Sequence, residues 1–83
     1  MSIAFDPAKD TANIAKHGVS LARAADLDVF ARIVDARFEE PRYKAFGLLD
    51  GQAYCLAYTI RDGRVRAISL RRAHLKEFRR HVR

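Results

Sequence analysis

Residues 44–70, KAFGLLDGQAYCLAYTIRDGRVRAISL, decide the fold of this 83-residue chain. The stretch holds two Asp-Gly pairs, Asp50-Gly51 and Asp62-Gly63, and each pair stands between runs typical of strands. Asp-Gly between such runs is a strong hairpin signal, because the tight turn that joins twisted antiparallel strands needs a positive φ at both central residues. The stretch therefore predicts three antiparallel strands in a meander, at about residues 44–49, 53–61 and 64–70.

Side chains alternate along the central strand of this meander. Tyr54, Leu56, Tyr58 and Ile60 line one face, and Cys55, Ala57 and Thr59 line the other. Cys55 is the only cysteine, so it forms no internal disulfide. Its place in an apolar strand favours a buried, inert thiol over a reactive one.

The N-terminal part of the chain predicts two helices. A short apolar run, SIAF, could open a sheet, and Asp6-Pro7 then supplies an N-cap and a proline at the first helical position. We expect this helix to reach about His17 and to end at Gly18. Ser20 is placed to cap a second helix, whose apolar face would be Leu21, Ala24, Ala25, Leu27 and Phe30. Residues 32–38 are a possible further strand, and residues 39–42 are a loop.

A last helix is expected to open at Arg72 or Ala73. On it Leu75, Phe78 and Val82 form a stripe that can dock on the sheet. Beside the stripe lies a cationic ridge of Arg72, Lys76, Arg79, Arg80 and Arg83. The fold class is therefore α+β, with two N-terminal helices, an antiparallel sheet of three to four strands and a basic C-terminal helix, in one domain spanning residues 1–83.

Charge is concentrated at the C-terminal end. Residues 1–60 hold seven Lys or Arg and eight Asp or Glu, whereas residues 61–83 hold nine against two, so the net charge of +6 comes from the tail. Such segregation points to a polyanionic partner, and a merely solvated basic helix is the alternative. The chain has no long apolar run and no signal-peptide pattern at its start, which favours a cytoplasmic protein without a membrane partner.

The sequence lacks the residue patterns of several catalytic classes. His17, His74 and His81 do not form a metal-ligand cluster, and we find neither a glycine-rich phosphate loop nor a nucleophile motif. We therefore expect no metal and no cofactor. RNA cleavage needs none of these, because the ribose 2′-OH is the nucleophile and the protein supplies proton transfer and cations. Residues suited to that chemistry are Lys16, His17, Arg42, Tyr58, Arg66, Arg71 and Arg72.

Two segments, FDPAKDTANIAKHGVSLARAADLDVF at 5–30 and AYTIRDGRVRAISLRRA at 57–73, carry a family resemblance. With Glu77 and Phe78 downstream, they resemble the BrnT toxins of bacterial BrnT–BrnA toxin–antitoxin pairs. The resemblance implies a RelE-like fold and a ribonuclease that arrests translation in the bacterial cytoplasm. It also implies neutralisation by BrnA, a ribbon-helix-helix DNA-binding antitoxin, in a complex that represses its own operon. Operator DNA would then be bound only through the antitoxin complex.

Residue by residue, we assign two sets of candidates. The catalytic set is Lys16, His17, Tyr58, Arg71 and Arg72, and the RNA-binding set is Arg42, Arg64, Arg66, Lys76, Arg79, Arg80 and Arg83. Several of these have structural alternatives. Lys16 and His17 would also stabilise a helix C-terminus, and Tyr58 would also serve as a core aromatic. Glu77 is expected to pair with Arg80 or Lys76 rather than act as a base.

Two functional alternatives stay open at this level. One is a basic nucleic-acid-binding module without catalysis, and the other is a partner-binding component of a repressor complex whose nuclease has degenerated. Incubation of the purified protein with a defined RNA separates the ribonuclease from both.

Overall fold

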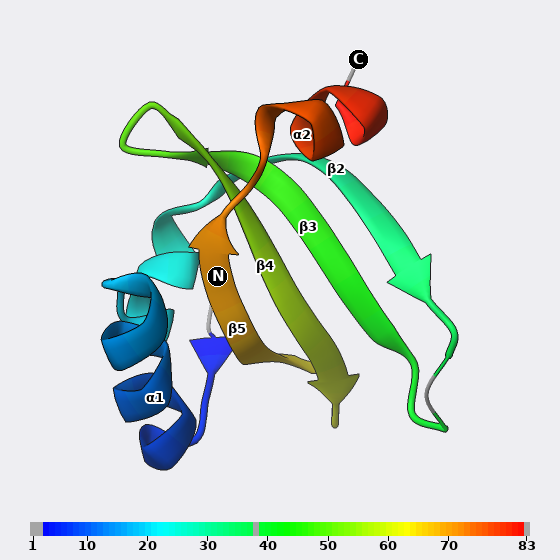
Figure 1. The fold of residues 1–83 in the computed structure, drawn as a ribbon. Helices are drawn as coiled ribbons and strands as arrows, with labels where there is room; N and C mark the ends of the chain where they lie inside the picture. The colour runs from blue at the N-terminus through cyan, green and yellow to red at the C-terminus, as the bar shows by residue number, and fades with distance from the viewer. Residues whose placement is uncertain (1–2, 38, 83) are drawn as a thin grey trace.

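The computed structural model describes residues 3–37 and 39–82. Its elements follow the chain as β1 (Ile3–Ala4), α1 (Pro7–His17), the 3₁₀-helix η1 (Leu21–Asp26), β2 (Asp28–Asp35), β3 (Arg42–Leu49), β4 (Gln52–Arg61), β5 (Arg64–Arg72) and α2 (Leu75–His81) (Figure 1). The five strands form one sheet in the order β1-β5-β4-β3-β2. β1 runs parallel to β5, and every other neighbouring pair is antiparallel.

The predicted meander is confirmed as β3, β4 and β5. Both turns have the expected backbone, with φ of 52° and 77° at Asp50 and Gly51, and of 52° and 76° at Asp62 and Gly63. Positive φ at both central residues matches the twist of the flanking strands. The sheet has five strands rather than three or four, because the SIAF run and residues 28–35 each add one.

The first helix is confirmed, and the second is shorter than predicted. The Asp6 carboxylate accepts a hydrogen bond from the Ala8 amide, and Gly18 ends α1 with a φ of 73°. Ser20 caps η1 as expected, but η1 stops at Asp26 and Phe30 lies in β2. The physical reason is non-local, since residues 28–35 pair along their length with β3. The strand predicted at residues 32–38 begins and ends earlier, as β2 at Asp28–Asp35. Phe38 lies outside the described residues.

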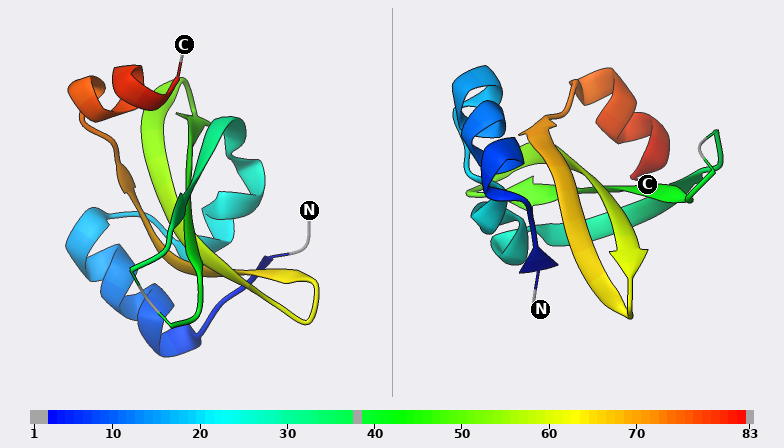
Figure 2. Two further views of the ribbon diagram at one scale, coloured as in Figure 1. Left: turned by 90° about the vertical axis from the view of Figure 1, so that its right-hand side faces the viewer. Right: turned by 90° about the horizontal axis from the view of Figure 1, so that it is seen from below.

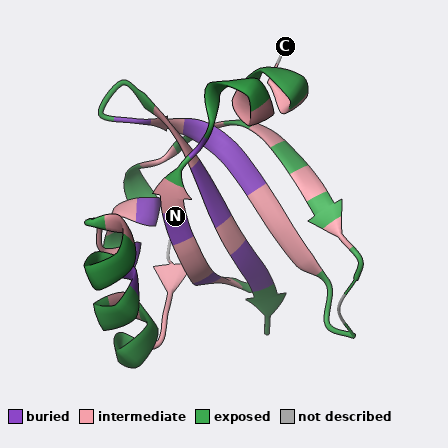
Figure 3. Cartoon of the chain, in the orientation of Figure 1, coloured by how far each residue is buried: buried purple, intermediate pink, exposed green. Residues whose placement is uncertain are grey.

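Apolar side chains pack on both faces of the sheet. The buried residues lie mostly along the central strands of the sheet (Figure 3), and η1 and α2 lie on its opposite faces (Figure 2). On one face, Leu21 and Ala24 of η1 join Leu56, Ala67 and Leu70 in the larger cluster. On the other face, α2 sits over a smaller cluster of buried residues, to which Phe78 and Val82 contribute. The sheet thus has η1 on one side and α2 on the other.

Predictions for two single side chains, Cys55 and Leu75, can be compared with the structure around the smaller cluster. Cys55 is buried there, 2% exposed, and burial raises the pKa of its thiol. Leu75 does not dock with Phe78 and Val82, because α2 begins only at Leu75 and leaves that side chain 62% exposed. Arg72 is likewise not on the helix but at the end of β5.

One buried polar side chain fixes α1 against the sheet. The carboxamide of Asn13, 5% exposed, donates to the carbonyl oxygens of Leu70 and Val19 at 2.9 Å each and accepts from the Leu70 amide at 3.1 Å. β1 pairs with β5 only at Val65 and Arg66. At Leu70, further along the same strand, the Asn13 carboxamide makes the backbone hydrogen bonds that a neighbouring strand would otherwise make. This brings the C-terminal end of α1 next to the C-terminal end of β5.

Candidate functional site

A cleft of about 480 Å³ lies where α1 ends beside the end of β5. Its lining consists of Lys16, His17, Arg71, Arg72 and His74, and we call it the end cleft. Among the described residues that line it, each side chain is a cation or an imidazole. The end cleft unites four of the five predicted catalytic residues, because the Asn13–Leu70 hydrogen bonds join segments 57 positions apart.

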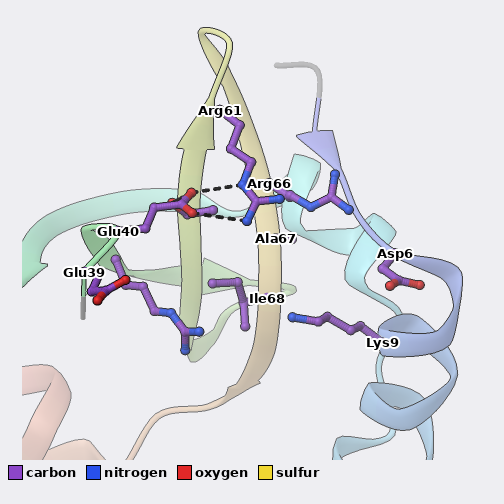
Figure 4. Close-up of a pocket in the computed structure, with 10 residues that line it drawn as sticks. Asp6, Lys9, Glu39, Glu40, Arg61, Arg66, Ala67 and Ile68 are labelled. Carbon is purple, nitrogen blue, oxygen red and sulfur yellow. Dashed lines mark hydrogen bonds and ion pairs between the residues drawn. The ribbon is translucent and has the colours of Figure 1, made fainter. Parts of the chain in front are cut away.

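A second cleft, the middle cleft, continues from it along β5. It measures about 460 Å³ and is lined by Lys9, Ala12, Asn13, Lys16, His17, Ile68, Ser69 and Arg71. A third, the far cleft, measures about 530 Å³ and is lined by Asp6, Lys9, Glu39, Glu40, Arg42, Thr59, Arg61, Arg66, Ala67 and Ile68 (Figure 4). All three volumes fall in the range of small-molecule sites.

Arg71 is held by an acidic partner. Its guanidinium donates to both carboxylate oxygens of Glu77, at 3.1 and 3.2 Å, and to the Arg72 carbonyl oxygen at 3.3 Å. These hydrogen bonds hold the pKa of Glu77 below its usual value and raise that of Arg71. Glu77 thus binds Arg71 rather than the Arg80 or Lys76 expected from sequence. The pair orients Arg71, ties α2 to β5 and offsets part of the Arg71 charge.

Arg72 and His74 complete the end cleft. The Arg72 guanidinium lies 5.8 Å from the centroid of the Tyr54 ring, a cation–π contact that leaves its N–H groups available. His74 is the N-cap residue of α2, but its side chain makes no cap hydrogen bond. His74 is not among the catalytic residues predicted from the sequence. Its place directly after the Arg71–Ala73 segment was the signal that could have found it.

Tyr58 does not belong to this group. It is 6% exposed, packs in the larger cluster and stacks on Tyr43 with ring centroids 5.4 Å apart. The prediction that Tyr58 is catalytic therefore does not fit its position in the fold, and strand alternation gives the reason. Arg71 pairs with Cys55, whose side chain points to the face opposite that of Tyr58. Tyr58 is the core aromatic of the alternative interpretation.

The predicted RNA-binding residues fall into separate places. Arg42 and Arg66 line the far cleft, where Arg61 forms a two-point ion pair with Glu40 at 3.0 and 3.1 Å. The Thr59 hydroxyl also donates to Glu40, and both contacts lower the pKa of that carboxylate. Arg64 begins β5 just after the Asp62-Gly63 turn. Lys76, Arg79 and Arg80 are exposed on α2 and line none of the three clefts, and Arg83 lies outside the described residues.

Within residues 3–37 and 39–82, no three His, Cys, Asp or Glu side chains come together as a metal-binding group. No helix in these segments has the length and apolar character needed to cross a membrane.

Comparison with known proteins assigns a family. The profile described as "Ribonuclease toxin, BrnT, of type II toxin-antitoxin system" matches residues 5–77. The chain belongs to the BrnT family of ribonuclease toxins. Membership in this BrnT family implies an RNA substrate and an antitoxin partner.

A solved BrnT structure agrees with this assignment. The crystal structure of the Brucella abortus ribonuclease toxin BrnT is similar to this chain with a TM-score of 0.71 and 27% sequence identity. The alignment covers 89% of this chain and 97% of the Brucella protein. No curated protein sequence matches the chain. The α+β class is therefore shared with a BrnT toxin, and the RelE-like description stays a prediction.

Proposed function

We propose that this chain is an endoribonuclease toxin that cleaves RNA through the ribose 2′-OH without a resident metal and thereby inhibits translation. Family membership supports the ribonuclease activity in general. The observation that carries the mechanism is the end cleft, where Lys16, Arg71 and Arg72 stand beside the imidazoles of His17 and His74.

The reaction requires two proton transfers and stabilisation of negative charge. A base takes the 2′-OH proton, O2′ forms a bond to phosphorus, and the bond from phosphorus to O5′ breaks. An acid then protonates O5′, so the products are a 2′,3′-cyclic phosphate and a 5′-hydroxyl. In the transition state, charge gathers on the non-bridging oxygens, where preorganised cations lower the barrier most.

Each part of this scheme has a candidate in the end cleft. Imidazole is the side chain most often used for proton transfer near neutral pH, and His17 and His74 provide two of them. Lys16 and Arg72 are exposed and directed to the same cleft, so they are suited to contact the phosphate oxygens. Arg71 is oriented by Glu77 before substrate arrives, so little reorganisation accompanies its contact with the phosphate.

Single-turnover cleavage of a defined RNA in excess EDTA tests this proposal. Arg72→Ala should lower the rate about 10²–10³-fold, by analogy with the loss of one charge-stabilising donor. His17→Ala and His74→Ala should each lower it about 10²–10⁴-fold, as expected for loss of a proton-transfer group. Arg32→Ala, an exposed cation on β2 at the opposite edge of the sheet, is the matched control and should cleave at the wild-type rate.

Substrate and product chemistry give the second half of the test. RNA carrying deoxyribose at the scissile position should resist cleavage, and the products should end in a cyclic or 3′-phosphate. Strict dependence on a divalent ion would refute the mechanism. Wild-type rates in folded Arg72→Ala, His17→Ala and His74→Ala variants would refute the site.

The partner proposed is a BrnA-like ribbon-helix-helix antitoxin, through which alone the toxin reaches operator DNA. Support comes from the exposed cations Lys76, Arg79 and Arg80 of α2, which suit an acidic antitoxin segment laid across the helix. Co-expression with the neighbouring open reading frame should yield a stable complex without nuclease activity. A neighbour that neither co-purifies nor relieves toxicity would remove this part of the proposal.

A further inference from the structure

The three clefts are parts of one trough. The end and middle clefts share Lys16, His17 and Arg71, and the middle and far clefts share Lys9 and Ile68. Their common wall is β5, and α1 contributes residues to all three. From Arg71 to Arg66 the strand advances five residues, or roughly 17 Å at about 3.3 Å per residue. One phosphate group cannot span that distance, so a ligand that fills the whole trough must be extended.

We infer that this trough is the path of the single-stranded RNA substrate, and that its far cleft is a subsite for a nucleotide beside the one that is cleaved. The inference rests on the proposed function, because it takes the end cleft as the place of cleavage. The charge pattern of the sequence instead predicted most RNA contacts on the basic C-terminal helix.

The far cleft supplies cations from both of its walls. Lys9 projects from α1 toward Ile68 of β5, as Figure 4 shows, and Arg66 lies on β5 itself. Arg61 is different, because Glu40 accepts two hydrogen bonds from it and offsets its charge. Arg42 lines the far cleft from β3, whereas Lys9 and Arg66 come from α1 and β5, the two elements common to all three clefts. We therefore assign Lys9 and Arg66 to the phosphate of the neighbouring nucleotide.

Acidic groups in the same cleft make it a nucleotide site rather than a site for bare phosphate. Asp6 and Glu39 also line it, and carboxylates repel phosphate. Carboxylates accept hydrogen bonds from the exocyclic amino groups of bases, and unstacked bases are what proteins recognise in single-stranded RNA. A cavity of about 530 Å³ with cations on both walls and carboxylates at its edge suits one nucleotide with its base.

The α2 cations lie outside this path. Phe78 and Val82 hold α2 against the sheet, and Lys76, Arg79 and Arg80 are exposed and line none of the clefts. The contribution of Lys9 and Arg66 in the trough to RNA binding can therefore be compared directly with that of Arg79 and Arg80 on α2.

The experiment measures binding alone. The probe is a fluorescent RNA oligonucleotide with 2′-fluoro ribose at every position, which lacks the nucleophile, and affinity is measured by anisotropy over a range of salt concentrations. For single strands the log–log salt slope changes by about 0.7 for each phosphate contact. Lys9→Ala/Arg66→Ala should flatten the slope by about 1.4 if each residue binds one phosphate, by the same relation. Arg79→Ala/Arg80→Ala, with the same loss of charge, should leave the slope unchanged.

The outcomes separate this inference from the proposed function. An unchanged slope in the Lys9/Arg66 variant, or an equal loss in both variants, would overturn the RNA path, even if the wild-type protein cleaves RNA. Conversely, a wild-type protein that never cleaves natural RNA would refute the proposed function, while a selective Lys9/Arg66 effect would still support the path. Lys9 is exposed on α1, so Lys9→Ala alone keeps the test available should the double variant fail to fold, with about half the slope change expected.

Discussion

Replacing Glu77 with Gln is expected to lower the free energy of unfolding by about 1.5 kcal/mol. The change keeps the shape of the side chain and removes one half of the ion pair with Arg71. Exposed pairs contribute about 0.2–1 kcal/mol, and hydrogen bonds to charged groups contribute about 1.5–3 kcal/mol. With two contacts at 3.1 and 3.2 Å and side chains only 29% and 28% exposed, this pair falls between the two classes.

Thermal unfolding measures the effect. For a domain of this size, 1.5 kcal/mol corresponds to a fall in Tm of about 6–12 °C. A double-mutant cycle with Arg71→Gln isolates the interaction between the two side chains from the separate effects of each change. Asp26→Asn is the control, because its ion pair with Arg23 joins more exposed side chains, 41% and 64%, and its loss should change Tm much less.

The stability contributed by the Glu77–Arg71 pair should decrease as the pH falls. Because Arg71 holds the pKa of Glu77 below its usual 4.5 in the folded protein, the stabilisation is complete above about pH 4.5. It is lost as the pH falls through the lower pKa of the folded state, so the Tm values of the wild type and Glu77→Gln should converge in acid. Equal effects of Glu77→Gln and Asp26→Asn at neutral pH, or a difference that widens in acid, would refute this account of the pair.

Three further predictions concern stability and reactivity. Asn13→Ala should cost about 3 kcal/mol in denaturant unfolding, because it strands both buried backbone groups of Leu70; a loss under 1 kcal/mol would contradict that role. Gly47→Ala should cost about 1–3 kcal/mol, because the added Cβ would clash with the Asp28 carbonyl oxygen of β2; unchanged stability would argue against this close approach. Cys55 should not react with a thiol reagent in the native protein at pH 8 and should react fully in denaturant, because burial raises its pKa; rapid native labelling would show that the thiol is accessible.

Local signals in the sequence were sufficient for part of this fold. The two Asp-Gly turns and the first helix with its Asp6 cap and Gly18 end depend on φ preferences and contacts within a few residues, so they are legible without knowledge of the rest of the chain. The burial of Cys55 was likewise predicted locally, from its place in an apolar strand. The family resemblance also rested on sequence, and the profile match confirms it.

Contacts between distant segments decided the remainder. Pairing of residues 28–35 with β3 ended η1 early, and strand register turned Tyr58 toward the core and away from Arg71. The buried Asn13 amide holds the end of α1 at the end of β5, which brings Lys16 and His17 to Arg71 and Arg72 in one cleft. Sequence therefore supplied the cations and imidazoles that we propose to bind and cleave RNA. Tertiary structure alone decided which of them meet, because side-chain direction and the pairing of distant segments depend on how the whole sheet packs.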